Sequence, residues 1–159
     1  MEFPRVREWA GTIASEMLIV RWGERRYLVP AHAMIDFCNV VNTGWEPRPC
    51  PSGAAWLRTN DWKKPAEGRP SVPLSHREYL LDKPIEATVI SSRGHTFTLD
   101  AGAAEGVRVG MEFNLVSPGD VVWFAQIVGV NPHEAEATTF YESDEAVVGW
   151  KMSTRESGR

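Results

Sequence analysis

Hydrophobic and polar residues alternate with period two through much of the second half of the chain. Phe97 and Leu99 alternate with threonines, and Met111 and Phe113 flank Glu112. This alternation predicts strands that bury one face, and Arg-Gly, Pro-Gly-Asp and Asn-Pro segments supply the turns between them. We expect five strands, at residues 85–91, 96–100, 111–117, 121–130 and 136–142, and a sixth at residues 147–152. Short strands joined by tight turns predict a small closed or nearly closed barrel.

The first half has a mixed pattern. Residues 17–22 and 26–29 are two apolar segments around a Gly-Glu-Arg turn, which predicts a hairpin. Pro30 suits the first turn of a helix that continues to about Asn42, and Gly44 is placed to end it. The apolar stripe of this helix recurs at i, i+3, i+4 and i+7, at Met34, Phe37, Cys38 and Val41.

Proline dominates the segment between these two patterns. Residues 47–73 hold six prolines together with Trp56 and Trp62. Polar linkers rarely carry tryptophan, so we expect an ordered, wrapped loop rather than a disordered one. The predicted class is α+β: an N-terminal region (1–83) of hairpin, helix and wrapped loop packs on a five- or six-stranded β-barrel (84–154), and 155–159 form a disordered tail.

Three glycines, at positions 102, 106 and 110, lie between two predicted strands. Glycine permits a positive φ and a close approach of backbones, both of which a barrel corner needs. We expect Val107 and Val109 to plug the barrel end while Glu105 and Arg108 face water. A phosphate-binding loop would precede a helix, often with a lysine; here a strand follows, which favours a structural corner.

The same stretch carries a resemblance, read on Thr98 to Gly102, Gly106-Val107 and Gly110 to Phe113. It resembles small bacterial β-barrel modules such as the C-terminal domain of the flagellar protein FlgT and the barrels of the rod-shape protein MreC. The resemblance covers about residues 85–152 and implies a non-enzymatic assembly or interaction part. The chain departs from both proteins because we see no export or membrane-anchoring segment in it.

The first half resembles a family of uncharacterised bacterial proteins, and this likeness implies no mechanism. The matching positions are Trp22-Gly23, Tyr27-Leu28-Val29-Pro30, Phe37-Cys38-Asn39, Val41-Asn42 and Glu46-Pro47-Arg48.

Charge is unevenly distributed along the 159 residues. The net charge of −4 divides into +2 for residues 1–83 and −6 for residues 84–159. An acidic second half disfavours contact with a phosphate backbone. The apolar runs are too short to cross a bilayer, and the first residues do not form a signal peptide. We therefore expect a cytoplasmic protein without membrane insertion.

Candidate catalytic groups are sparse. No histidine pairs with a cysteine or another histidine at metal-ligand spacing, so we expect neither a metal nor a cofactor. His76, Glu78 and Asp82 form the only local titratable cluster, and a solvated turn leading into the barrel is the favoured interpretation. The alternative is a hydrolytic enzyme that uses these three residues. No serine lies in a nucleophile-elbow pattern.

The two cysteines differ in setting. Cys38 lies on the apolar stripe, where a buried thiol is inert. Cys50 lies between two prolines, and its redox role stays open.

Tryptophan and arginine combine in the middle of the chain, and these two residue types are enriched at binding hot spots. The candidate partner-binding residues are Trp45, Arg48, Trp56, Arg58 and Trp62; internal stacking of the same side chains is the alternative. The leading hypothesis is a non-catalytic protein-interaction or scaffold protein with no catalytic residue, whose protein partner is unknown and whose oligomeric state is open. Small barrels also bind single strands on aromatic platforms, so a single-stranded nucleic-acid-binding protein is the alternative, which the acidic charge disfavours.

Overall fold

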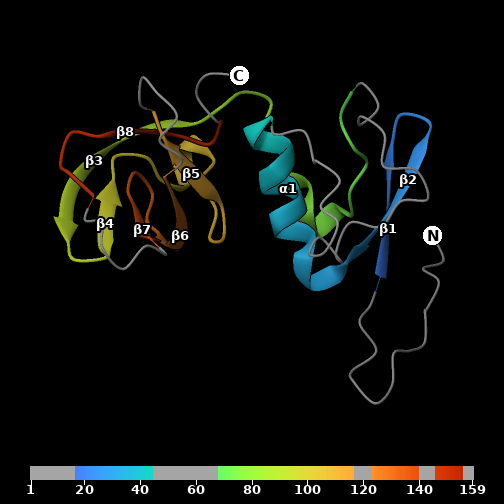
Figure 1. Cartoon of the computed structure of the whole chain (residues 1–159), viewed down its shortest axis with the longest axis horizontal. Helices are drawn as coiled ribbons and strands as arrows, with labels where there is room; N and C mark the ends of the chain where they lie inside the picture. Colours follow the sequence, from blue (N-terminus) through green and yellow to red (C-terminus); the bar gives the residue numbers. More distant parts are fainter. Residues whose placement is uncertain (1–16, 45–67, 117–122, 140–145, 156–159) are drawn as a thin grey trace, which may run out of the picture.

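The structure is a computed structural model of the chain and describes residues 17–44, 68–116, 123–139 and 146–155. A closed β-barrel forms one end of the molecule and a two-stranded sheet the other, with the helix α1 (Met34–Thr43) between them (Figure 1). The predicted α+β class with a small closed barrel is confirmed. The segment 45–67, which holds most of the predicted wrapped loop, and the end of the predicted tail lie outside the described residues.

The predicted hairpin is confirmed. Strands β1 (Met17–Trp22) and β2 (Arg25–Pro30) pair antiparallel, with Trp22 opposite Arg25. Gly23 closes the turn at φ 60°, a conformation that glycine adopts without strain. The sheet buries one face against the helix.

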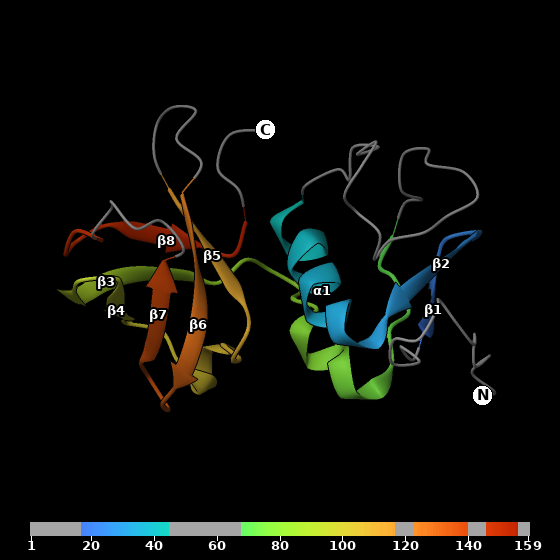
Figure 2. The same ribbon diagram turned by 60° about the horizontal axis from the view of Figure 1, so that its bottom comes forward.

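The predicted helix is also confirmed. A 3₁₀ turn, η1 (Ala31–Ala33), leads into α1, which ends at Gly44 with φ 73°. Met34, Phe37 and Cys38 of the apolar stripe are buried, because this side of α1 covers the hairpin. A second 3₁₀ turn, η2 (Leu74–Tyr79), packs beside α1 and leads to the barrel (Figure 2).

Six antiparallel strands close the barrel: β3 (Glu86–Arg93), β4 (Thr96–Leu99), β5 (Glu112–Leu115), β6 (Phe124–Val130), β7 (Ala135–Thr139) and β8 (Lys151–Ser153). Their order around the barrel is β3-β4-β7-β6-β5-β8, and β8 pairs with both β3 and β5. The sixth strand therefore exists and supplies the closure. Closure removes the free edges that a small sheet would otherwise expose.

Alternating side chains fill the barrel interior, as the period-two pattern predicts. Phe97, Leu99, Met111 and Phe113 are fully buried. Most of the remaining core is aliphatic or small, including three alanines of β6 and β7, which lets the strands curl tightly. Its other fully or nearly fully buried members are Ile85, Ala87, Val89, Ala101, Val107, Trp123, Ala125, Ile127, Ala135, Ala137, Ala146 and Met152.

Two β-bulges interrupt the alternation. The register shifts between Val89 and Ser91 on β3 and between Ile127 and Gly129 on β6. The residue inside each bulge, Ile90 and Val128, is consequently turned to the surface, with 43% and 48% of its area exposed. In the strand order β3 and β6 are three steps apart in either direction, so these two aliphatic side chains lie on opposite walls of the barrel.

The glycine-rich corner contains a 3₁₀ turn, η3 (Ala103–Glu105), rather than a long helix. Gly110 has φ 88°, whereas Gly102 has a φ of −139° and is needed for a different reason. A Cβ atom on Gly102 would lie 2.7 Å from the backbone nitrogen of His133, so only glycine permits this approach. Val107 plugs the barrel end as expected.

The expectation for Val109 was wrong. Its side chain is exposed, because the chain turns outward there to meet the N-terminal part, and the Tyr79 hydroxyl donates a hydrogen bond of 3.2 Å to the Val109 carbonyl oxygen.

Candidate functional site

Because apolar side chains fill the barrel interior, the polar side chains that could bind a ligand or partner lie on its outer wall. A groove of about 400 Å³ runs over β3 and β8 and is lined by Glu86, Thr88, Asp100, Val116 and Lys151 above the buried Ala87 and Met152. Antiparallel pairing sets Thr88 opposite Lys151, and the alternation of β3 places Glu86 on the same outer side as Thr88. The groove is thus a direct product of strand register.

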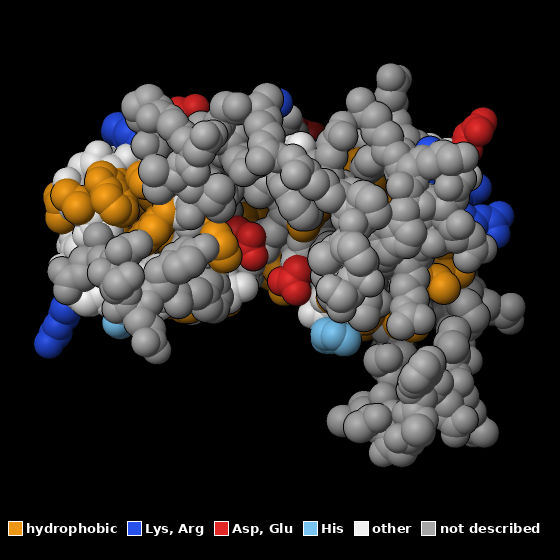
Figure 3. Space-filling model, in the orientation of Figure 1, with side chains coloured by type: hydrophobic (Ala, Val, Ile, Leu, Met, Phe, Trp, Pro, Cys, Tyr) orange, Lys and Arg blue, Asp and Glu red, His pale blue; other side chains and the backbone are white. Residues whose placement is uncertain are grey.

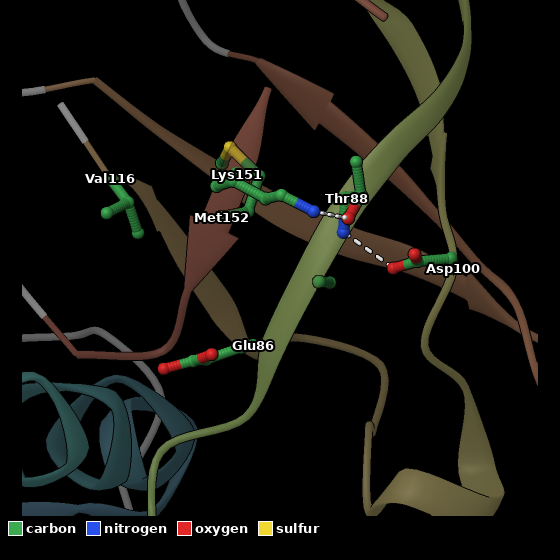
Figure 4. A pocket seen from close by; sticks show the side chains of 7 residues that line it. Glu86, Thr88, Asp100, Val116, Lys151 and Met152 are labelled. Carbon is green, nitrogen blue, oxygen red and sulfur yellow. Dashed lines mark hydrogen bonds between the residues drawn. The ribbon is translucent and has the colours of Figure 1, made fainter. Parts of the chain in front are cut away.

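The polar side chains of the groove are arranged around Thr88. Lys151 extends from β8 to β3, and its Nζ donates to the Thr88 hydroxyl at 2.7 Å, while Glu86 points away from Lys151 (Figure 4). On the other side of β3 the Thr88 amide donates to the Asp100 carboxylate at 2.5 Å. Among the residues that the structure describes, no carboxylate oxygen lies within 4.0 Å of the Lys151 ammonium.

Exposed aliphatic residues continue this groove toward the far end of the barrel. Val147 and Val148 precede β8 and expose 54% and 60% of their area. Hydrogen bonds from the Val89 amide to the Trp150 carbonyl oxygen and from the Gly149 amide to the Val89 carbonyl oxygen tie this turn to β3. They place the turn that holds Val148 next to the bulge that holds Ile90, and hydrophobic side chains gather on this end of the barrel (Figure 3).

A second feature is the junction between α1 and the barrel. Asn39 is 2% exposed, and its side-chain amide donates to the Gly110 carbonyl oxygen at 2.8 Å. Its side-chain oxygen accepts from the Glu112 amide at 3.3 Å. The pairing of β5 with β8 begins only at Asn114, so Asn39 occupies the backbone edge that β8 leaves open. The Asn39 side chain therefore holds the junction by making the two backbone hydrogen bonds that a neighbouring strand would otherwise make.

Two carboxylates face this junction. Burial raises the pKa of the Glu112 carboxyl on β5, and the negative charge of Asp36 on α1 raises it further. Burial also raises the pKa of Asp36, and nearby His32 lowers it in part. Acidic side chains are visible in the hollow between the two parts of the molecule (Figure 3). Both groups consequently hold their protons to higher pH than free carboxylates do.

A third feature is a hollow of about 310 Å³ on the N-terminal part. Trp22, Asn42, Arg69 and Asp82 line it, and Arg69 and Asp82 form an ion pair of 2.6 Å. Gly44 and Gly68 also line this hollow, so the segment 45–67 leaves and rejoins the described chain at one place. The candidate partner-binding residues Trp45, Arg48, Trp56, Arg58 and Trp62 belong to that segment and lie outside the described residues.

The described tryptophans pack against other rings. Trp22 contacts Tyr27 and Phe37, with ring centroids 5.9 and 6.1 Å apart. Trp150 packs edge-on against Trp123, with centroids 5.2 Å apart. These rings pack in or against the two hydrophobic cores.

The predicted titratable cluster of His76, Glu78 and Asp82 is not brought together as one site. The three side chains make separate contacts. Glu78 pairs with Arg108 of the barrel corner at 3.3 Å, and His76 Nδ1 lies 3.0 Å from the Ser75 hydroxyl. Asp82 is held by Arg69 in the hollow described above.

Two further sequence expectations can be placed. Cys38 is buried, and burial raises the pKa of its thiol to about 12, so it is a packing residue as predicted. Cys50 lies outside the described residues.

In the glycine corner the Gly102 amide donates a hydrogen bond to the Glu105 carboxylate at 2.7 Å, which lowers the pKa of that carboxyl. This amide therefore already has a hydrogen-bond acceptor within the chain.

Sequence reasoning missed Asn39, Glu86, Thr88 and Lys151. The signal for the last three was present in part: Glu86 and Thr88 occupy the polar phase of a strand, and Lys151 is a rare cation in an acidic half. The signal for Asn39 was an amide side chain on the same turn as the apolar stripe, directly after two buried positions.

No family model and no curated protein sequence matches the chain. In the described ranges there is no group of three or more histidine, cysteine or acidic side chains that could hold a metal ion. None of the described helices is long and apolar enough to cross a membrane.

Proposed function

We propose that this chain is a non-catalytic protein-interaction or scaffold protein built around its small barrel. The observation that carries the proposal is the closed barrel whose interior is filled by its own apolar side chains. A filled barrel offers its outer wall and its attached segments for recognition, rather than an internal ligand cavity. The resemblance to the FlgT and MreC type of barrel module supports the same role.

The Trp- and Arg-bearing segment 45–67 is the surface that we assign to a protein partner. Both of its ends are anchored to described elements: Gly44 follows α1, and the Gly68 carbonyl oxygen accepts a hydrogen bond from the Trp22 indole. Arg69, the next residue, is held by Asp82. A segment with fixed ends loses less conformational freedom on binding than a free tail, which favours recognition.

The experiment compares recovery of partners by two double variants. Trp45→Ala/Arg48→Ala removes two candidate contacts, and Arg77→Ala/Arg93→Ala removes two exposed cations that do not line the hollow beside Gly44 and Gly68, as a control. The tagged chains are expressed in the native host, cross-linked, purified and compared by quantitative mass spectrometry, with circular dichroism to verify the fold. We expect one partner to be lost from the first variant alone.

Equal recovery of every protein by wild type and by the Trp45/Arg48 variant would refute the assignment of this surface. A titration with single-stranded oligonucleotides tests the alternative. Quenching of tryptophan fluorescence that weakens with added salt would support nucleic-acid binding instead.

A further inference from the structure

We propose that the chain forms a two-fold dimer through the outer wall of β3 and β8. This β3–β8 face consists of Glu86, Thr88, Ile90, Val147, Val148 and Lys151. The proposal goes beyond the contact with a different protein, because it uses another surface and another kind of partner, a second copy of this chain.

The aliphatic half of the face consists of three exposed side chains. Ile90, Val147 and Val148 expose 43%, 54% and 60% of their area, and the hydrogen bonds between Val89 and the turn before β8 hold the segments that carry them next to each other. Val116, which is also 43% exposed, borders this face: it follows β5 on the other side of β8, and its amide donates to the Lys151 carbonyl oxygen. Clustered exposed aliphatics of this kind mark a contact surface, whereas scattered ones need no explanation.

The polar half carries both signs of charge. Lys151 donates to the neutral Thr88 hydroxyl, and in the described part of the chain its ammonium has no carboxylate within 4.0 Å. Glu86 is exposed and points away from it (Figure 4). Glu86 is the acid of this face, whereas Asp100 accepts the Thr88 amide on the other side of β3.

The arrangement along the strands is self-complementary. A two-fold axis that lies in the contact plane and runs parallel to β3 and β8 keeps every residue at its own height along the strand. The aliphatic end then meets the aliphatic end of the second copy. The strand register sets Lys151 opposite Thr88 and one alternation from Glu86, so its long side chain reaches the Glu86 carboxylate of the second copy.

Other occupants fit the face less well. A peptide that adds a strand needs an open sheet edge, which a closed barrel does not offer. An acidic peptide would pair with Lys151 but would be repelled by Glu86. A basic peptide would pair with Glu86 but would be repelled by Lys151. A second copy supplies one cation and one anion at the required positions, which is why we commit to it.

The test is the mass of the full chain in solution by light scattering and sedimentation. We expect wild type at twice the chain mass of 17.8 kDa. Lys151→Glu and Glu86→Lys should each give monomers, because each places like charges opposite each other. An equimolar mixture of the two variants, and the double variant K151E/E86K, should recover the dimer, because opposite charges face each other again.

Val148→Ser should also weaken the dimer. Val128→Ser is its matched control, since Val128 is a similarly exposed valine that lies in the bulge of the opposite wall. Circular dichroism verifies that every variant is folded. A monomeric wild type at the highest soluble concentration would overturn the proposal. So would dimers that persist in both single charge reversals, because Lys151 and Glu86 would then make no contact between copies. Neither result bears on the partner-capture experiment, which uses the Trp45/Arg48 surface.

Discussion

The side chain of Asn39 connects the two parts of the molecule, and its removal tests whether they form one unit. Asn39→Ala deletes the hydrogen bond to the Gly110 carbonyl oxygen and the one from the Glu112 amide. The position is 2% exposed, so water cannot readily replace them. A typical hydrogen bond contributes about 1 kcal/mol net, and a buried group left unsatisfied costs about 1–3 kcal/mol.

Gly110 and Glu112 are only half-buried, so we take about 1–2 kcal/mol for each lost hydrogen bond, which gives about 2–4 kcal/mol for the two. Alanine is the better helix former by up to about 0.7 kcal/mol, which offsets a small part of this loss. We expect Asn39→Ala to lower the free energy of unfolding by about 1.5–3 kcal/mol, measured by urea denaturation.

Hydrogen exchange of the same variant locates the effect. The Glu112 amide should lose protection, since Asn39 is its acceptor, whereas the Leu81 amide should keep its own. Asn42→Ala is the matched control, because Asn42 lies further along α1 and accepts from the Leu81 amide at 3.0 Å. In the control variant the Leu81 amide should therefore lose protection against exchange, and the Glu112 amide should keep it. A loss below about 0.5 kcal/mol in Asn39→Ala, the scale of an ordinary surface substitution, would refute the strand-like role of Asn39.

Three more outcomes are expected. Gly102→Ala should lower the melting temperature markedly, because its Cβ would lie 2.7 Å from the His133 nitrogen; an unchanged melting temperature would contradict the close approach. Glu112 keeps its proton to higher pH in the folded chain than in the unfolded chain, so stability falls as pH rises above its ordinary pKa of 4.5. Glu112→Gln should thus be more stabilising at pH 7 than at pH 4, and equal denaturation midpoint shifts at the two pH values would contradict the raised pKa. Cys38 should react with a thiol reagent only as fast as the chain unfolds, and rapid labelling of a Cys50→Ser variant, in which Cys38 is the sole thiol, would disprove its burial.

Much of the fold was predictable because the determining signals are local. Alternation of Phe97 with Leu99 and of Met111 with Phe113 identified buried strand faces, and the stripe from Met34 to Cys38 identified the helix. Val109 misled the same reasoning. Its spacing from Val107 matches a strand phase, but the chain turns outward there toward Tyr79, which is 30 residues away in sequence.

The surfaces were harder to foresee. The exposure of Ile90 depends on a register shift between β3 and β4, and a bulge has no local hydrophobic signature in this sequence. Its position beside Val148 depends on the return of β8 to β3 after the four intervening strands. The candidate partner-binding residues were chosen by composition, and they stay a prediction; they are Trp45, Arg48, Trp56, Arg58 and Trp62.

By itself the sequence determined the alternating strands, the amphipathic helix, the hairpin turn and the acidic character of the second half, because periodicity and charge are properties of neighbouring residues. Only the tertiary structure decided which strands meet, that β8 closes the barrel against both β3 and β5, and that Asn39 takes over the edge that β8 leaves open. The physical reason is that a free strand edge or a charged side chain pairs with the groups that the fold places next to it. Those groups are often far away in the sequence, where no local pattern of residues can identify them.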